Sequence, residues 1–287
     1  MTENDKILYI GFGFNGEPGL DSLLKQGSFD IVGVVTPRID DKHQRKLYPE
    51  GLPVEKLAQQ NGLTIYQTDD NKRIQEIIEE KQPTSVMMCY YTKIIPQSML
   101  EGGPTYFNIH HGCVLPRLRG SSNTEWAVRN GINKITISLF QAVPGLDEGD
   151  LYWEPEITIT DEETVVDLRR KMNDCLRENL GRVYEHILHP ERSPDLDSIV
   201  FRREQTEEGA TYTCSIRPED NVIDWTKPAK EIYNLIRSGC DPEVAAVTTF
   251  YQGNPLRVWQ AKLQKSTKVW EGHIPGKPIA RTKEGVE

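Results

Sequence analysis

Two side chains with catalytic potential lie close together near the middle of the chain. Asn108 and His110 are two residues apart in a short apolar run, so on a strand both leave by the same face. The turn at 145–150 then supplies Asp147. An amide donor, an imidazole that titrates near neutral pH and a carboxylate that orients the imidazole suit acyl transfer through an oxyanion.

Each of these residues also has a purely structural explanation. A single histidine near the end of a strand is more often a hydrogen-bonded structural residue than a catalytic one. The sequence Asp-Glu-Gly-Asp at 147–150 is also typical of an ordinary turn. The set is therefore informative only through the order and spacing of its members.

The order of the motifs resembles that of the formyltransferase family that uses 10-formyltetrahydrofolate. The chain contains N-x-H at 108–110, L-P-x-x-R-G at 115–120 and G-L-D-x-G-D at 145–150. The tripeptides Ile-Asp-Trp at 223–225 and Arg-Val-Trp at 257–259 are similar to the C-terminal domain that several members share. The resemblance thus covers most of the chain.

The resemblance implies a reaction and a set of roles. A formyl group would pass from 10-formyltetrahydrofolate to a primary amine, without a metal ion. Asn108 and His110 would donate hydrogen bonds to the oxygen that becomes negative, and Asp147 would orient the imidazole. In related proteins the loop after the strand at 85–90 lies along the pterin of the folate. The residues implied in folate binding are Tyr91, Lys93, Ile94, Ile95, Val143, Gly145 and Leu146.

One departure from the family leaves the catalytic histidine open. Members usually have five positions from the histidine to the proline of the L-P pair, whereas His110 lies six before Pro116 and His111 lies five before it. Either the loop has one extra residue and His110 is catalytic, or the register shifts and His111 is. We favour His110 because it alone shares a face with Asn108, and because a turn absorbs an insertion more easily than a strand does.

The loop that follows the histidines contains further candidates. The resemblance implies that Arg119 and Gly120 shape the backbone over the reacting centre, although a surface turn explains Arg119 equally well. Cys113 is expected to be an ordinary small residue. For Tyr90 and Tyr91, a place in the core and a place in the pocket are equally good predictions.

The acceptor of the formyl group is left open. Arg38, Lys42, Arg45 and Lys46 could form part of a basic surface for methionyl-tRNA, or simply solvate a loop. A nucleotide-linked amino sugar, or another free or carrier-bound biosynthetic amine, needs only a pocket and suits the formal net charge of −9 better. If water is the acceptor, the chain corresponds to the hydrolase domain of a larger folate dehydrogenase.

A different class of function follows from Gly11, Gly13 and Gly16, whose G-x-G-x-x-G spacing is typical of dinucleotide-binding loops. Arg38 could hold the extra phosphate of NADP, so an NAD(P)-binding oxidoreductase is the alternative. The strand at 29–35 ends without the acid that would hold an adenosine ribose, which argues against it. A catalytically idle folate-binding or scaffold domain is a third possibility.

The hydrophobic pattern predicts a doubly wound, mostly parallel α/β sheet followed by a smaller β-barrel-like domain. We expect a catalytic domain at 1–190, a linker at 191–208 and an OB-like C-terminal domain at 209–287. Expected strands lie at 7–10, 29–35, 63–66, 85–90, 135–141, 151–159, 210–216, 246–251 and 256–263. Expected helices lie at 53–60, 71–81, 123–130, 161–189 and 228–238, and 40–51 reads as a loop.

Composition excludes several other classes of protein. At 287 residues with 37% hydrophobic and 27% charged residues, the chain reads as a globular protein without a membrane span or secretory leader. Its five scattered cysteines favour reduced thiols and a cytoplasmic location over a disulfide or zinc framework. The last residues, 281–287, read as a turn about to continue as a strand, so the chain could be one domain of a longer polypeptide.

Overall fold

The computed structural model describes residues 4–39, 42–47, 49–91, 93–240, 246–264, 274–283 and 285–286. Its centre is a sheet in the strand order β3-β2-β1-β4-β5-β7-β8, with β9 paired to β7. The strands are β1 (Asp5–Gly11), β2 (Phe29–Thr36), β3 (Ile65–Gln67), β4 (Ser85–Cys89), β5 (Thr105–Cys113), β7 (Lys134–Gln141), β8 (Leu151–Trp153) and β9 (Glu156–Thr158). The strands from β3 to β5 pair in parallel, and β7 runs antiparallel to β5, β8 and β9.

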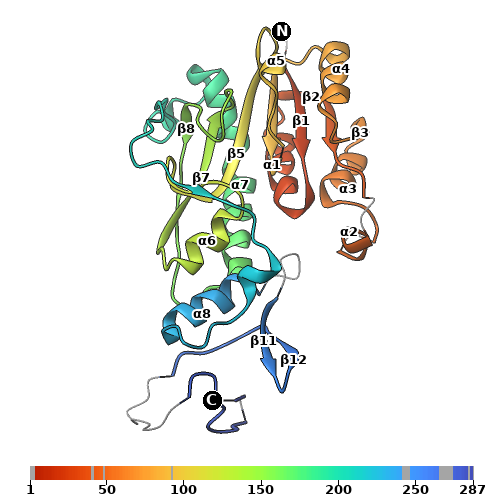
Figure 1. The fold of residues 1–287 in the computed structure, drawn as a ribbon. Helices are drawn as coiled ribbons and strands as arrows, with labels where there is room; N and C mark the ends of the chain where they lie inside the picture. The colour runs from red at the N-terminus through yellow and green to blue at the C-terminus, as the bar shows by residue number, and fades with distance from the viewer. Residues whose placement is uncertain are drawn as a thin grey trace.

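Helices cover both faces of this sheet (Figure 1). One face packs in an apolar cluster with helices including α1 (Gly13–Gln26), α3 (Pro53–Gln60) and α7 (Val165–Leu188), and the other packs against α4 (Asn71–Lys81) and α5 (Gln97–Leu100). All five residues of β4 are buried, as a strand covered on both faces requires. The doubly wound α/β fold expected from the sequence is confirmed.

The long helix α7 begins where the chain supplies a capping box. The Thr164 hydroxyl accepts a hydrogen bond from the Asp167 N–H, and the Asp167 carboxylate accepts one from the Thr164 N–H. These bonds satisfy donors that the first helical turn leaves without partners. The helix therefore starts at Val165. The sequence pattern had predicted a start at 161.

The C-terminal part lies at one end of the molecule, beyond α6 (Asn123–Arg129), and appears in blue in Figure 1. It contains α8 (Ala229–Ser238) and an antiparallel hairpin of β11 (Val247–Tyr251) and β12 (Asn254–Val258). Within the described ranges, this hairpin is the part of the expected barrel that is seen. No helix of the described chain is long and apolar enough to cross a membrane.

Polar contacts join the C-terminal part to the N-terminal half of the chain. The Arg129 guanidinium on α6 donates to the Ser238 hydroxyl at 2.9 Å and to the Asp220 carbonyl at 3.1 Å. On α8, Arg237 donates to the carbonyls of Thr160 and Glu163, each at 2.9 Å. Arg237 is buried and Arg129 is half-buried, so these hydrogen bonds contribute to a specific packing of the two parts.

Three segments differ from their expected form. The region 40–51 contains the short helix α2 (Lys42–Leu47) rather than only a loop. The expected strand at 151–159 is divided into β8 and β9 around Pro155, which has no N–H to donate to the ladder. The expected strand at 210–216 is reduced to β10 (Tyr212–Thr213), which pairs in parallel with β6 (Arg119–Gly120).

Candidate active site

Strand β5 places its polar residues on alternate faces. Tyr106 packs in the cluster with α4 and α5, whereas Phe107 and Ile109 pack in the cluster with α1 and α7. By this alternation Asn108 and His110 share the face of Tyr106, and His111 points to the other face. The pairing with β7 becomes irregular only between His111 and Cys113, so the regular strand includes both histidines.

The loop after His111 folds tightly against α6. Gly112 has φ +73°, and a Cβ there would lie 2.1 Å from the Thr124 hydroxyl oxygen. A side chain at this position would therefore clash while also adopting a conformation that L-residues disfavour. The register of the strand pairing shifts between His111 and Cys113, just after the two histidines.

The imidazole of His110 lies against the carboxylate of Asp147. The His110 Nε2 and Asp147 Oδ2 atoms are 2.9 Å apart, with side-chain exposures of 11% and 12%. The ring N–H does not point along this contact closely enough to form a hydrogen bond, a misalignment that is common before a substrate binds. Two groups separated by a strand and a loop are thus brought into direct contact.

The carboxylate of Asp147 is held as an anion. Burial raises its pKa, but the contact with His110, the hydrogen bond that the Gly120 N–H donates at 2.8 Å and the nearby Arg119 guanidinium outweigh burial, so the net pKa is lowered. Asp147 itself has φ +57°, in the left-handed region. A charged carboxylate at this place can stabilise a protonated imidazole at His110.

His111 has a different electrostatic environment. Burial, followed by the neighbouring His110 and the Arg169 guanidinium, lowers the pKa of His111 to about 3. Its ring lies beside that of Tyr90, with ring centroids 6.5 Å apart. His111 is therefore neutral at physiological pH and cannot supply the charged imidazolium that the expected mechanism requires.

A cavity of about 500 Å³ opens beside these residues. Three buried polar atoms among its lining residues, Asn108 Oδ1, His110 Nε2 and His111 Nε2, have no hydrogen-bond partner within the described residues. Since buried polar groups usually have hydrogen-bond partners, these atoms are available to a ligand that enters the cavity. Within the same described ranges, no group of three or more His, Cys, Asp or Glu side chains is placed to hold a metal ion.

All seven residues expected to bind folate line this cavity: Tyr91, Lys93, Ile94, Ile95, Val143, Gly145 and Leu146. The wall they form is apolar, and Ile94 is 69% exposed, although Ile95 is buried. The Tyr91 hydroxyl donates to Asn71 Oδ1 at 2.9 Å, and burial raises its pKa to about 12. An exposed isoleucine beside a cavity can pack against an apolar ring system.

The opposite wall is polar and was not predicted from the sequence. It includes Ser121, Asn123 and Thr124 from the start of α6, together with Glu125, which is 3% exposed and paired with Arg169 of α7. The pairing compensates the buried charge of Glu125 at the wall of the cavity. Arg169 lies 44 positions from Glu125, so no local pattern could have connected them.

Arg119 is not in a surface turn, so that explanation is wrong. Its side chain is fully buried, and the guanidinium donates to Glu207 at 2.8 Å and to Gln205 at 3.3 Å. The Gln205 amide in turn donates to the carbonyls of Asp147 and Gly149, at 2.8 and 2.7 Å. A segment expected to be only a linker therefore packs on the turn that carries Asp147.

The glycine-rich loop after β1 has a structural role. A Cβ at Gly16 would lie 3.0 Å from the Gly11 carbonyl carbon, and the Tyr9 hydroxyl donates to the Gly16 carbonyl. Glycine at this position lets α1 pack directly on β1. This close packing explains the spacing of the motif without a dinucleotide.

Comparison with known proteins places these features in a family. Residues 5–183 match the model of the formyl transferase family, and residues 215–287 match the model of the formyl transferase C-terminal domain. A methionyl-tRNA formyltransferase of Caldanaerobacter subterraneus is 31% identical over 90% of this chain and 81% of its own length.

Solved structures agree on the fold. A 4-N formyltransferase from Francisella tularensis covers 91% of this chain and 99% of its own, with a TM-score of 0.68 and 17% identity. HypX from Aquifex aeolicus, solved with tetrahydrofolic acid, covers 99% of this chain and 42% of its own, with a TM-score of 0.60 and 15% identity.

The matched residues 5–183 include the glycine-rich loop and the whole cavity beside His110 except its two residues from the C-terminal side, Thr213 and Ser215. The glycine spacing that suggested an oxidoreductase therefore lies within the formyl transferase domain. The chain belongs to the formyl transferase family and is a formyltransferase.

Proposed function

We propose that the chain transfers a formyl group from 10-formyltetrahydrofolate to a primary amine, with Asn108, His110 and Asp147 at the reacting centre. The observation that carries this proposal is the 2.9 Å contact between His110 Nε2 and Asp147 Oδ2, beside the unpartnered Asn108 Oδ1, at the cavity. An amide, an imidazole and a carboxylate thus meet where a ligand can enter.

The chemistry follows from the charge that develops. The amine nitrogen attacks the formyl carbon, so a new C–N bond forms and the formyl oxygen becomes negative. The Asn108 amide and the His110 imidazole donate hydrogen bonds to this oxygen, each contributing about 3 kcal/mol. Asp147 orients the imidazole through the 2.9 Å contact. The bond from carbon to the folate nitrogen then breaks, and a proton passes from the amine to that nitrogen.

The same geometry favours His110 over His111 for this role. His110 contacts the carboxylate, whereas His111 lies beside Tyr90 and Arg169 on the other face, with a pKa lowered to about 3. A neutral imidazole is a weaker donor than a charged one, because charge-assisted hydrogen bonds are roughly twice as strong. We assign His111 no proton transfer.

The folate would lie against the apolar wall formed by the two loops 91–96 and 143–147. Wild-type protein should therefore be protected from thermal unfolding by a non-reactive folate analogue and not by NAD or NADP, since only a ligand of the native state raises its stability. Protection by NADP without protection by the folate analogue would contradict the proposal and restore the oxidoreductase alternative.

Replacement of Ile94 by aspartate should weaken folate binding much more than it lowers the free energy of unfolding. Ile94 is 69% exposed, so the new charge remains hydrated in the free protein but must lose water against the pterin. Titration of the folate analogue, followed by fluorescence, measures the affinity. Ile199→Asp is the matched control, because Ile199 is also exposed (47%) and lies outside the cavity. Unchanged affinity in Ile94→Asp would remove this loop from the folate site.

Replacement of Gln205 by alanine should lower kcat about tenfold, the effect of about 1.4 kcal/mol, while the KM for folate changes little. The reason is that the Gln205 amide holds the carbonyls of Asp147 and Gly149, and so fixes the turn that carries the carboxylate. Steady-state kinetics across pH would show the loss, and Gln75→Ala on the exposed face of α4 is the control. If Gln205→Ala has the kcat of the wild type, the turn that carries Asp147 keeps its conformation without the Gln205 hydrogen bonds.

A further inference from the structure

Glu125 is a buried carboxylate in the wall of the cavity beside His110, and the proposed mechanism does not use it. It is 3% exposed, yet it lines this cavity, as Asp147 does. These two are the only carboxylates among the described residues that line it. Asp147 is already engaged, because its Oδ2 contacts His110 and accepts a hydrogen bond from the Gly120 N–H. Glu125 is therefore the carboxylate that is left for a ligand.

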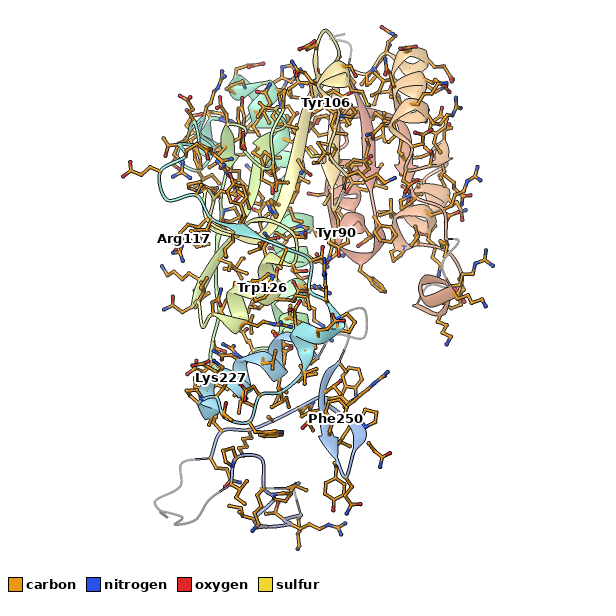
Figure 2. The ribbon with its side chains drawn as sticks, viewed as in Figure 1. Tyr90, Tyr106, Arg117, Trp126, Lys227 and Phe250 are labelled. Carbon is orange, nitrogen blue, oxygen red and sulfur yellow. The ribbon has the colours of Figure 1, made fainter. Side chains whose placement is uncertain are left out.

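Hydrogen bonds of the neighbouring residues fix the position of Glu125. The Asn123 amide donates to the Thr213 hydroxyl at 3.1 Å, and the Trp126 indole donates to the Cys214 carbonyl at 2.8 Å. Figure 2 labels Trp126 on α6, above the C-terminal part in that view. The backbone that carries Glu125 is thus held in place before a ligand binds, so little further ordering is needed on binding.

Arg169 compensates the charge of Glu125 without covering the whole carboxylate. Its guanidinium donates to Glu125 Oε1, and among the described residues no other group donates a hydrogen bond to this carboxylate. An ionised carboxylate can accept several hydrogen bonds through its two oxygens. Glu125 Oε2 can therefore accept a hydrogen bond from a ligand while Oε1 keeps its contact with Arg169.

Apart from Arg169, the described residues of the polar wall place no positive charge against a cationic ligand. His111 also lines the cavity, and burial is the main cause that lowers its pKa to about 3. Its imidazole is therefore neutral at physiological pH. Lys93, on the apolar wall, is paired with Asp69 at 2.8 Å. A ligand with one positive charge can therefore approach the carboxylate of Glu125.

The acceptor in the proposed reaction brings such a charge. A primary amine on an alkyl chain titrates near pH 10, as the lysine side chain does, so at neutral pH it is an ammonium ion. An ammonium group is very costly to bury without a partner, and a carboxylate offsets that cost. Since the folate would occupy the apolar wall, the amine must reach the reacting centre along the polar wall that carries Glu125.

We propose that Glu125 binds the ammonium group of the formyl acceptor and holds its nitrogen toward the reacting centre, with Arg169 positioning the carboxylate. This inference rests on the proposed formyl transfer and adds an acceptor-binding residue to it. One ammonium proton passes to solvent before the nitrogen attacks the formyl carbon. Of the two protons that remain, one passes to the folate nitrogen as the bond from carbon to that nitrogen breaks, and the other stays on the formamide.

The test compares two small nucleophiles in the reaction with 10-formyltetrahydrofolate. Methylamine is charged at neutral pH, whereas hydroxylamine is mostly uncharged there. We expect Glu125→Gln to raise the KM for methylamine by about tenfold or more, because a charge-assisted hydrogen bond is lost, and to change the KM for hydroxylamine little. The difference in the methylamine KM between wild type and variant should shrink as the pH approaches about 10, where methylamine loses its charge.

Two further variants separate charge from shape. Glu125→Asp keeps the charge on a shorter side chain, so its KM for methylamine should lie between those of wild type and Glu125→Gln. Glu17→Gln is the matched control, because Glu17 also pairs with an arginine of α7, Arg177 at 2.7 Å, but lies outside the cavity. Its KM values should be those of wild type. All three variants should keep wild-type affinity for a folate analogue, which shows that they are folded.

Failure of this inference is distinct from failure of the proposed function. An unchanged KM for methylamine in Glu125→Gln, or an equal rise for both nucleophiles, would show that Glu125 does not bind the ammonium group. Loss of folate affinity in that variant would show a structural role instead. If wild type binds the folate analogue but formylates neither nucleophile, an ammonium group alone is not recognised and the inference is wrong. If the folate analogue does not bind wild type, formyl transfer itself is refuted.

Discussion

Replacement of His110 by alanine is expected to lower kcat by about 100-fold or more, with folate affinity close to that of wild type. The imidazole contacts Asp147 and lines the cavity of about 500 Å³, so in the proposed mechanism it acts mainly on the charge that develops in the transition state. A group that stabilises only the transition state changes kcat and leaves ground-state binding nearly intact.

His111→Ala is the matched control, because the two histidines are adjacent but face opposite sides of β5. His111 is neutral, with a pKa lowered to about 3, and its loss should cost much less activity. Kinetics with both variants, together with folate titration, decide between them. If His111→Ala is inactive while His110→Ala keeps most of its activity, the extra residue precedes the catalytic histidine and our assignment of His110 is wrong.

Replacement of Asp147 by asparagine should resemble His110→Ala in the size of its effect. The amide can still accept a hydrogen bond, including the one from the Gly120 N–H at 2.8 Å, but it carries no charge to stabilise a protonated imidazole. Since the carboxylate has a lowered pKa, it is ionised at neutral pH, and the variant removes a charge that the wild type has.

The double variant His110→Ala with Asp147→Asn should lose little beyond the worse of the two single variants. Residues that act as one unit are strongly non-additive, because removing either one already disables the pair. Single-turnover rate constants of all four proteins give the coupling, as the product of the wild-type and double-variant constants divided by the product of the two single-variant constants. Fully additive losses would mean that the 2.9 Å contact between the two side chains has no role in the reaction.

Much of the sheet and its helices could be predicted from the sequence, because their signals are local. The helices α3 and α4 have the expected bounds, 53–60 and 71–81, since each begins at a Pro or an Asp-capped position and has an apolar stripe. The run at 85–90 was expected as a buried strand, and β4 is buried throughout. Periodicity and caps depend on residues that are close together in the sequence, so the sequence alone is enough to predict them.

The contact of His110 with Asp147 was anticipated for a different reason. Nothing local connects the two residues, which come from β5 and from the turn after β7. The expectation came from the resemblance of motif order to a known family. The antiparallel pairing of β5 with β7 places Gln141, the last residue of β7, beside Phe107, and the turn that follows brings Asp147 against His110.

The parts that sequence reasoning missed depend on long-range contacts. The segment at 191–208 has the composition of a linker, yet Gln205 donates to the turn that carries Asp147, and Glu207 accepts from the buried Arg119. The pairing of β10 with β6 and the ion pair of Glu125 with Arg169 also join distant parts of the chain. No periodicity encodes such contacts, since each depends on where the complete fold places two surfaces.

The most direct test of the account is a screen of primary amines with 10-formyltetrahydrofolate. Release of tetrahydrofolate would be followed by absorbance and the formylated amine by mass spectrometry, with His110→Ala as the inactive control. The account predicts tetrahydrofolate release that depends on the amine, with one formamide formed for each tetrahydrofolate. Release at the same rate without any amine, yielding formate, would contradict amine transfer and indicate the hydrolase alternative instead.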